Sequence, residues 1–126
     1  MEKDNFRYSG TVIHGAGNGK KFGFPTVNIK LAGDNIPLSK GVYAVEVLIE
    51  NQKKEGMLYV GTRPTLNFSE LSIEINIFNF SEEIYDRDIQ FNVLKKIRDE
   101  LVFDTTAELI KQIKKDQHEI MDFFKK

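Results

Sequence analysis

The sequence predicts a mainly β domain, a small barrel or sandwich of about six strands followed by one C-terminal helix. Three observations lead to this fold class. Short runs of alternating apolar and polar residues occupy the first two thirds of the chain, turn residues separate these runs, and apolar residues recur at helical spacing in the last quarter. A closed barrel suits such strands because closure removes their unpaired edges.

Several segments have the alternation and the β-branched or aromatic content of strands. The clearest is 71–77, LSIEINI, where apolar residues alternate with Ser72, Glu74 and Asn76, so that one face is buried and the other is polar. Residues 51–56, NQKKEG, predict the loop of a hairpin. In chain order the expected strands are 9–14, 27–31, 42–49, 57–60, 71–77 and 89–93.

The last quarter of the chain predicts one amphipathic helix over about residues 105–124. Its start is marked by the sequence TTAE, a capping box in which Thr105 is the N-cap and Glu108 reaches back to it. Apolar residues then fall on one stripe, which we expect to pack on the wall of a barrel formed by about residues 6–103. The stripe consists of Leu109, Ile110, Ile113, Ile120, Met121 and Phe124.

The composition excludes several classes of protein. A length of 126 residues suits one domain, 1–126, and a net charge of −1 gives no indication of a nucleic-acid or anionic-membrane partner. The absence of cysteine excludes disulfides, thiolate metal sites and a cysteine nucleophile. The sequence has neither a secretory signal nor an apolar stretch long enough to span a bilayer. We therefore expect a soluble cytoplasmic monomer.

A glycine-rich loop with two lysines follows the first expected strand. It reads GAGNGKK over 15–21, and its spacing fits neither the Walker A motif nor Gly-x-Gly-x-x-Gly. A strand is expected next, because Pro25 and the β-branched residues after it disfavour a helix. The backbone N–H groups and lysines could still close over a polyphosphate as a flap, although the spacing alone favours a plain flexible hairpin.

Three polar residues on the expected strands are candidates for chemistry. Thr26 and Asn28 flank Val27 and therefore share one face of a strand. Their hydroxyl and carboxamide oxygens suit Mg²⁺ and phosphate, although such residues more often bond to neighbouring strands. Glu74 lies in mid-strand on a polar face, where a carboxylate can take the proton of a substrate hydroxyl, although most strand glutamates are only solvated.

The candidates belong to a longer series of motifs in a fixed order. The series opens with YSGTVIHG at 8–15 and GKKFGFPTVN at 19–28. It continues with GVY at 41–43, GTRPT at 61–65, IEI at 73–75, IY at 84–85, IRDELVF at 97–103 and LIKQIKKD at 109–116. In this order, and over nearly the whole chain, the motifs resemble the riboflavin kinase family, whose pattern begins G-x-V-x-x-G, a glycine loop and G-F-P-T-A-N.

The resemblance implies a six-stranded antiparallel Greek-key barrel with a C-terminal α-helix. It also implies transfer of the γ-phosphoryl group of ATP to the ribityl 5′-hydroxyl of riboflavin, giving FMN and ADP. Glu74 would be the general base, Thr26 and Asn28 would hold Mg²⁺ (with another divalent metal as the alternative), and Arg98 would lie on the flavin side. The implied nucleotide-binding residues are Gly15, Gly17, Gly19, Lys20, Lys21, Gly23, Pro25, Thr26 and Asn28.

The chain departs from the family pattern at a few positions. Val27 replaces the usual Ala, Lys20 replaces an Arg, and Asp86 replaces a Gly. None of these changes affects Thr26, Asn28 or Glu74. Many bacterial relatives also have an N-terminal adenylyltransferase module that converts FMN to FAD. No stretch of this sequence resembles that module, so we expect either a standalone kinase or an excised kinase domain.

Two other classes remain as alternatives. A non-catalytic flavin-binding barrel would keep the fold and the flavin pocket, but it would have no use for Thr26, Asn28 and Glu74 together. A nucleic-acid-binding barrel would need basic residues interleaved with exposed aromatic residues, whereas the aromatic residues here fall mostly at apolar positions. The expected partners are therefore ATP and riboflavin.

Overall fold

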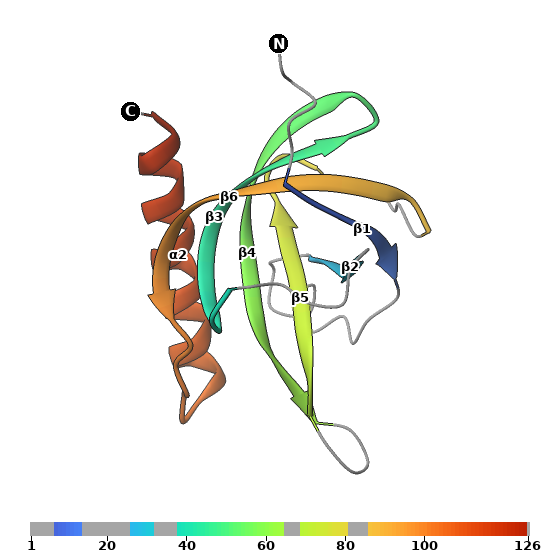
Figure 1. The fold of residues 1–126 in the computed structure, drawn as a ribbon. Coiled ribbons are helices and arrows are strands. Elements are labelled where there is room, and N and C mark those ends of the chain that lie inside the picture. Colours follow the sequence, from blue (N-terminus) through green and yellow to red (C-terminus); the bar gives the residue numbers. More distant parts are fainter. Residues whose placement is uncertain (1–6, 14–25, 32–37, 65–68, 81–85, 126) are drawn as a thin grey trace.

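The computed structural model describes residues 7–13, 26–31, 38–64, 69–80 and 86–125. Within these ranges the chain forms antiparallel strands and one long C-terminal helix (Figure 1). The elements are β1 (Tyr8–Ile13), β2 (Val27–Leu31), β3 (Gly41–Ile49), β4 (Gln52–Pro64), β5 (Ser69–Ile77), β6 (Asp88–Asp99) and α2 (Thr106–Lys125).

The strands close into a barrel in the order β1-β2-β5-β4-β3-β6, and every neighbouring pair is antiparallel. Strands β3, β4 and β5 follow one another as hairpins, and β6 returns to lie beside β3, which is the Greek-key arrangement. The predicted fold class is therefore confirmed. Closure gives every strand two hydrogen-bonded neighbours, so neither edge of the sheet is left unpaired.

The barrel interior is filled by apolar side chains from every strand. Leu58 and Ile75, on neighbouring strands, are completely buried, as is Phe91 on β6. This cluster explains the period-two alternation in the sequence, because alternate residues of a strand point to the same side. The buried members are Val12, Ile29, Tyr43, Val45, Val47, Ile49, Leu58, Val60, Ile73, Ile75, Ile77, Ile89 and Phe91.

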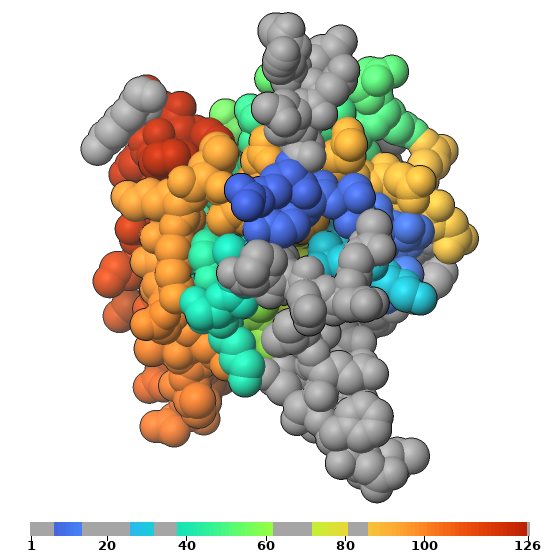
Figure 2. Space-filling view, viewed as in Figure 1, coloured from blue at the N-terminus to red at the C-terminus, as the bar shows by residue number. Residues whose placement is uncertain are grey.

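Helix α2 covers part of the outer face of the barrel, beside β3, β4 and β6. Val42 and Ala44 point outward from β3 and are nevertheless buried. They form a second apolar cluster with Ile120 of α2, Met57 of β4 and Phe78, which follows β5. Strand β3 is therefore apolar on both faces. In the space-filling view β6 and α2 form one continuous side of the molecule (Figure 2).

The start of α2 follows the predicted capping box with one difference. The backbone N–H of Glu108 donates to Thr105 Oγ1 over 3.1 Å, as expected for an N-cap. The Glu108 carboxylate, however, accepts from the backbone N–H of Asp104, over 3.2 Å, and not from that of Thr105. The side chain thus reaches one residue further back than predicted.

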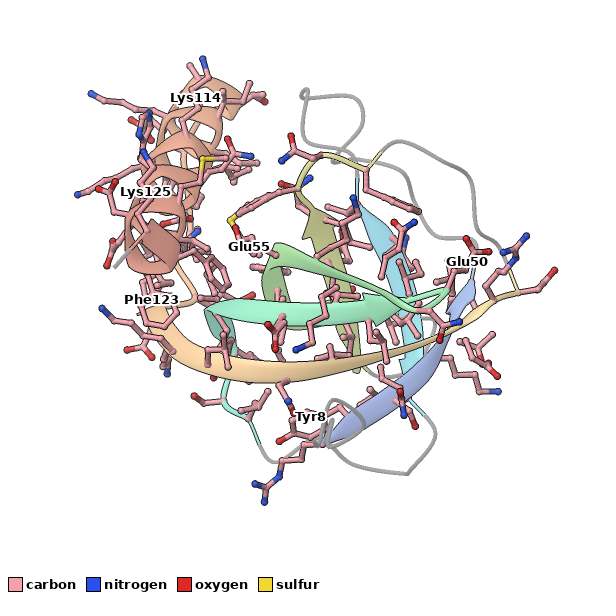
Figure 3. All side chains as sticks on the ribbon, turned by 90° about the horizontal axis from the view of Figure 1, so that it is seen from above. Tyr8, Glu50, Glu55, Lys114, Phe123 and Lys125 are labelled. Atoms are coloured by element: carbon pink, nitrogen blue, oxygen red, sulfur yellow. The ribbon has the colours of Figure 1, made fainter. Side chains whose placement is uncertain are left out.

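The predicted apolar stripe of α2 is correct except at Met121, which is exposed. The buried line instead runs through Asp116 and Ile120, and Phe123 packs beside it. Met121 lies about 100° around the helix from Ile120 and so falls on the edge of the stripe. Figure 3 shows Phe123 on α2 beside β6, where Lys95 Nζ lies 5.7 Å from the ring centroid.

The predicted hairpin loop over residues 51–56 is wrong. Strand β4 already begins at Gln52, which pairs with Ile49, so Glu50 and Asn51 alone form the turn. Both turn residues have positive φ, 49° and 67°, as required when two residues join twisted antiparallel strands.

Among the described residues no helix is long and apolar enough to cross a membrane.

Candidate active site

Strands β2 and β5 bring the three candidate polar residues together. Their register pairs Val27 with Ile75 and Asn28 with Glu74. Residues directly opposite each other in an antiparallel pair point to the same face, so Asn28 and Glu74 are side by side. Thr26, two positions before Asn28, lies on the same face, and its Oγ1 donates to Glu74 Oε1 over 3.0 Å.

The face that these residues occupy is the outer face of the barrel. Val27 packs against the interior cluster and Ile75 is fully buried in it, so the residues between and beside them point outward. Asn28 is nevertheless only 6% exposed, whereas Glu74 is partly exposed. The carboxylate thus lies beside a buried amide and remains partly accessible.

Both oxygens of Glu74 accept hydrogen bonds from hydroxyl groups. Thr26 bonds to Oε1, and Ser72 Oγ donates to Oε2 over 3.3 Å. A carboxylate has about four lone-pair positions, so these two donors leave acceptor capacity for a substrate hydroxyl. The two bonds also fix the direction in which the carboxylate points, which a proton acceptor in catalysis requires.

The donor set next to Glu74 fits a hard divalent cation. A threonine hydroxyl keeps two lone pairs when it donates its proton, so Thr26 can bond to Glu74 and still offer its oxygen to a cation. No cluster of three or more His, Cys, Asp or Glu residues occurs in the described part of the chain. A site of neutral oxygens with one carboxylate suits Mg²⁺, which keeps several waters and binds substrate phosphates.

The predicted flap lies outside the described residues. This applies to Gly15, Gly17, Gly19, Lys20, Lys21, Gly23 and Pro25. Their assignment to the nucleotide stays a prediction. In the sequence, Pro25 directly precedes Thr26.

Arg98, the predicted flavin-side residue, links β6 to α2. Its Nε lies 2.9 Å from each carboxylate oxygen of Asp116, and its Nη2 lies 2.8 Å from Oδ2. Gln112 donates to the same carboxylate over 2.9 Å. The guanidinium also lies 5.9 Å from the Phe103 ring centroid. These contacts give Arg98 a structural task, and its contact with flavin stays a prediction.

Sequence reasoning missed two neighbours of Glu74, Ser72 and Tyr59. Ser72 could have been found, because it lies two positions before Glu74 on the same polar face. Tyr59 could not, because its position depends on the β4–β5 register, which pairs it with Glu74. Its hydroxyl donates to Glu100 Oε2 over 2.8 Å. Burial, and then this carboxylate, raise the pKa of the Tyr59 hydroxyl far above its usual value.

The registers place the site residues in one row across the outer face of the barrel. Asn28 pairs with Glu74, Glu74 with Tyr59, Tyr59 with Val42, and Val42 with Arg98. The row thus crosses β2, β5, β4, β3 and β6, and α2 covers its far end through the bond between Arg98 and the helix. The partly exposed Glu74 lies near one end of this row.

The chain is similar to known proteins over nearly all of its length. The family model described as riboflavin kinase matches residues 2–124. A bifunctional riboflavin kinase/FMN adenylyltransferase from Buchnera aphidicola is 39% identical over 94% of this chain and 39% of that protein. The Escherichia coli K12 protein of the same description is 40% identical over 94% of this chain and 38% of its own length. The chain therefore spans less than half of these relatives.

Two solved structures have a similar fold. One, described as a macrolide-efflux protein from Streptococcus pneumoniae, superposes with a TM-score of 0.81 at 36% identity, over 88% of this chain and 36% of that one. The other, riboflavin kinase from Trypanosoma brucei, gives 0.63 at 22% identity, over 94% and 79%. The second likeness concerns the fold alone. Together with the family match over residues 2–124, these relatives identify the chain as a member of the riboflavin kinase family.

Proposed function

We propose that this chain transfers the γ-phosphoryl group of ATP to the ribityl 5′-hydroxyl of riboflavin, with FMN and ADP as products. The observation that carries the proposal is the grouping of Thr26, Asn28 and Glu74 on one face of paired strands, in a chain of this family. A non-catalytic flavin-binding barrel has no need for an oriented carboxylate beside two neutral oxygen ligands.

Glu74 is the proposed general base. Phosphoryl transfer depends mainly on positioning and on neutralising charge, so the protein has few covalent steps to perform. As the 5′-oxygen forms its bond to the γ-phosphorus and the bond from phosphorus to the ADP oxygen breaks, the hydroxyl proton passes to the Glu74 carboxylate. Thr26 and Ser72 hold that carboxylate in place through its two oxygens.

Thr26 and Asn28 are the residues that would hold the metal ion. When bound, Mg²⁺ supplies positive charge at the β- and γ-phosphate oxygens. Thr26 contributes both to the general base and to the metal site. Its hydroxyl hydrogen is donated to Glu74, and its oxygen lone pairs remain available to the metal ion. The nucleotide phosphates would therefore lie on the β2 side of Glu74.

The test is to incubate the purified chain with riboflavin, ATP and Mg²⁺ and to follow FMN and ADP by chromatography. The proposal predicts that both products appear in equal amounts and that a chelator of divalent metals stops the reaction. Binding of riboflavin without any FMN, whatever nucleotide or divalent metal is supplied, would identify a flavin-binding barrel that does not catalyse.

A further inference from the structure

The side of Glu74 that faces β4 is occupied by Tyr59. The two residues are direct partners in the β4–β5 register, and directly opposite side chains on one face lie about 5 Å apart at Cβ. Tyr59 is only partly buried, so part of its side chain is accessible at the surface. Anything that reaches Glu74 from the β4 side must pass this residue.

The geometry of phosphoryl transfer indicates that the acceptor substrate, whose hydroxyl is phosphorylated, approaches Glu74 from the side that faces β4. The attacking and leaving oxygens lie roughly in line through phosphorus, so donor and acceptor approach from opposite directions. Thr26 and Asn28, on β2, mark the donor side of Glu74 in the proposed function, on which this step rests. The acceptor therefore comes from the opposite side, over Tyr59.

The position of Tyr59 is fixed at two points. Its ring lies over Gly61, where an added Cβ would come within 2.4 Å of the ring atom Cε2 and 2.8 Å of the hydroxyl oxygen. Its hydroxyl donates to Glu100 over 2.8 Å, in the connection between β6 and α2. The ring thus lies along β4 toward Gly61, and it packs against the outer apolar cluster that includes Val42.

We propose that Tyr59 is a specificity residue that contacts the acceptor substrate beside the general base, and that Glu100 is the positioning residue that fixes the Tyr59 ring. A flat aromatic ring with one edge anchored offers an apolar surface at low entropic cost, which suits the planar ring system of a flavin. Without the bond to Glu100 the ring is free to rotate about its side-chain torsions. It then no longer presents its apolar face to the acceptor substrate.

The hydroxyl of Tyr59 keeps its proton throughout the pH range in which a kinase is assayed. Burial and the Glu100 carboxylate raise its pKa, Glu74 raises it further, and the opposing effect of Arg98 is smaller than that of burial. The hydrogen bond to Glu100 is therefore present under all ordinary assay conditions. The pair acts as a fixed support, so its removal has the same effect at pH 6 as at pH 8.

The test compares Tyr59→Phe and Glu100→Ala with the wild-type chain, by steady-state kinetics and by quenching of riboflavin fluorescence without ATP. Loss of a hydrogen bond to a charged group corresponds to about 10- to 100-fold, and we expect the riboflavin KM and Kd to rise by about tenfold or more. The ATP KM should change by less than about twofold, because ATP binds on the other side of Glu74. The double variant should be no worse than either single one, because both remove the same bond.

Three further variants accompany the test, and the first two are controls. Glu100→Gln keeps an oxygen acceptor for the Tyr59 hydroxyl and should retain near wild-type riboflavin binding. Tyr8→Phe removes a hydroxyl from a ring that stacks on Phe91 at the beginning of β1, and it should affect neither substrate (Figure 3). Gly61→Ala has no positive φ to strain, so it should weaken riboflavin binding only by displacing the Tyr59 ring.

An unchanged riboflavin KM and Kd in Tyr59→Phe would overturn the inference. So would an equal rise in the ATP KM, because that would indicate a general structural effect. Failure of the proposed function has a different signature, since the wild-type chain would then bind riboflavin and form no FMN. The fluorescence titration would still decide, in that case, whether Tyr59 and Glu100 support the flavin.

Discussion

The hydroxyl of Thr26 donates a hydrogen bond to Glu74 across 48 positions of sequence, with 3.0 Å between the two oxygens. The bond exists because β2 and β5, which are distant in the chain, are neighbours in the barrel. It joins the residue proposed to hold the metal to the residue proposed to take the proton. The donor and acceptor halves of the site are therefore connected directly.

Replacing Thr26 should reduce turnover in a way that depends on its hydroxyl. Thr26→Val keeps the shape but removes both the bond to Glu74 and the proposed metal ligand, whereas Thr26→Ser keeps the hydroxyl. A hydrogen bond to a charged group is worth about 1.5–3 kcal/mol, so we expect kcat/KM to fall by about 10- to 100-fold in the valine variant. Kinetics at several Mg²⁺ concentrations measure this effect. Wild-type kcat/KM in Thr26→Val would exclude the hydroxyl from the mechanism.

The ion pair between Arg98 and Asp116 should stabilise the attachment of α2 to the barrel. The side chains are 14% and 2% exposed, so removing either partner leaves a poorly solvated charge. Breaking such a pair costs about 3–5 kcal/mol, and we expect Asp116→Asn to lower the free energy of unfolding toward that amount. Urea denaturation followed by circular dichroism measures it.

A double variant separates the pair from the individual charges. Arg98→Met with Asp116→Leu should destabilise less than the sum of the single changes, because no unpaired charge remains. Asp99→Asn is the matched control, since its partner Lys96 is on the surface and the change should have little effect. Additive single effects would show that the two charges do not depend on each other.

The stability of the wild-type chain should fall relative to Tyr59→Phe above pH 10. The pKa of Tyr59 is raised in the folded protein, so the unfolded chain loses this proton first as the pH rises. The contribution of the hydroxyl is therefore complete below the unfolded pKa of about 10 and is lost as the pH rises beyond it toward the folded value. Thermal melts from pH 7 to pH 11 measure it, with the other tyrosines common to both proteins. A constant difference in Tm up to pH 11 would contradict the raised pKa.

Much of the fold could be predicted because the barrel buries one face of each strand. The alternation around Glu74 predicted an outward-facing carboxylate, and the spacing of Thr26 and Asn28 predicted that these two share a face. Such local patterns follow from the period of two along a strand. They are visible without knowledge of the strand order.

The register between strands could not be read in the same way. The β4–β5 register pairs Tyr59 with Glu74, and no local pattern of the sequence indicates that pairing. The β3–β4 register was missed as well, because β4 begins at Gln52 after a two-residue turn, whereas the sequence NQKKEG had predicted a longer loop. Asp116 is charged and was not expected in the buried line of α2, because its partner Arg98 comes from another element. Contacts between distant segments decided both cases.

The most direct test of the account is the activity of Glu74→Gln. The amide keeps the size of the side chain but cannot take a proton, and general-base help is worth about 10²–10⁴-fold. Glu46→Gln, in mid-strand on β3, is the matched control and should keep wild-type activity. The account predicts that Glu74→Gln binds riboflavin normally while FMN formation falls by at least about 100-fold. Near-normal FMN formation by this variant would contradict it.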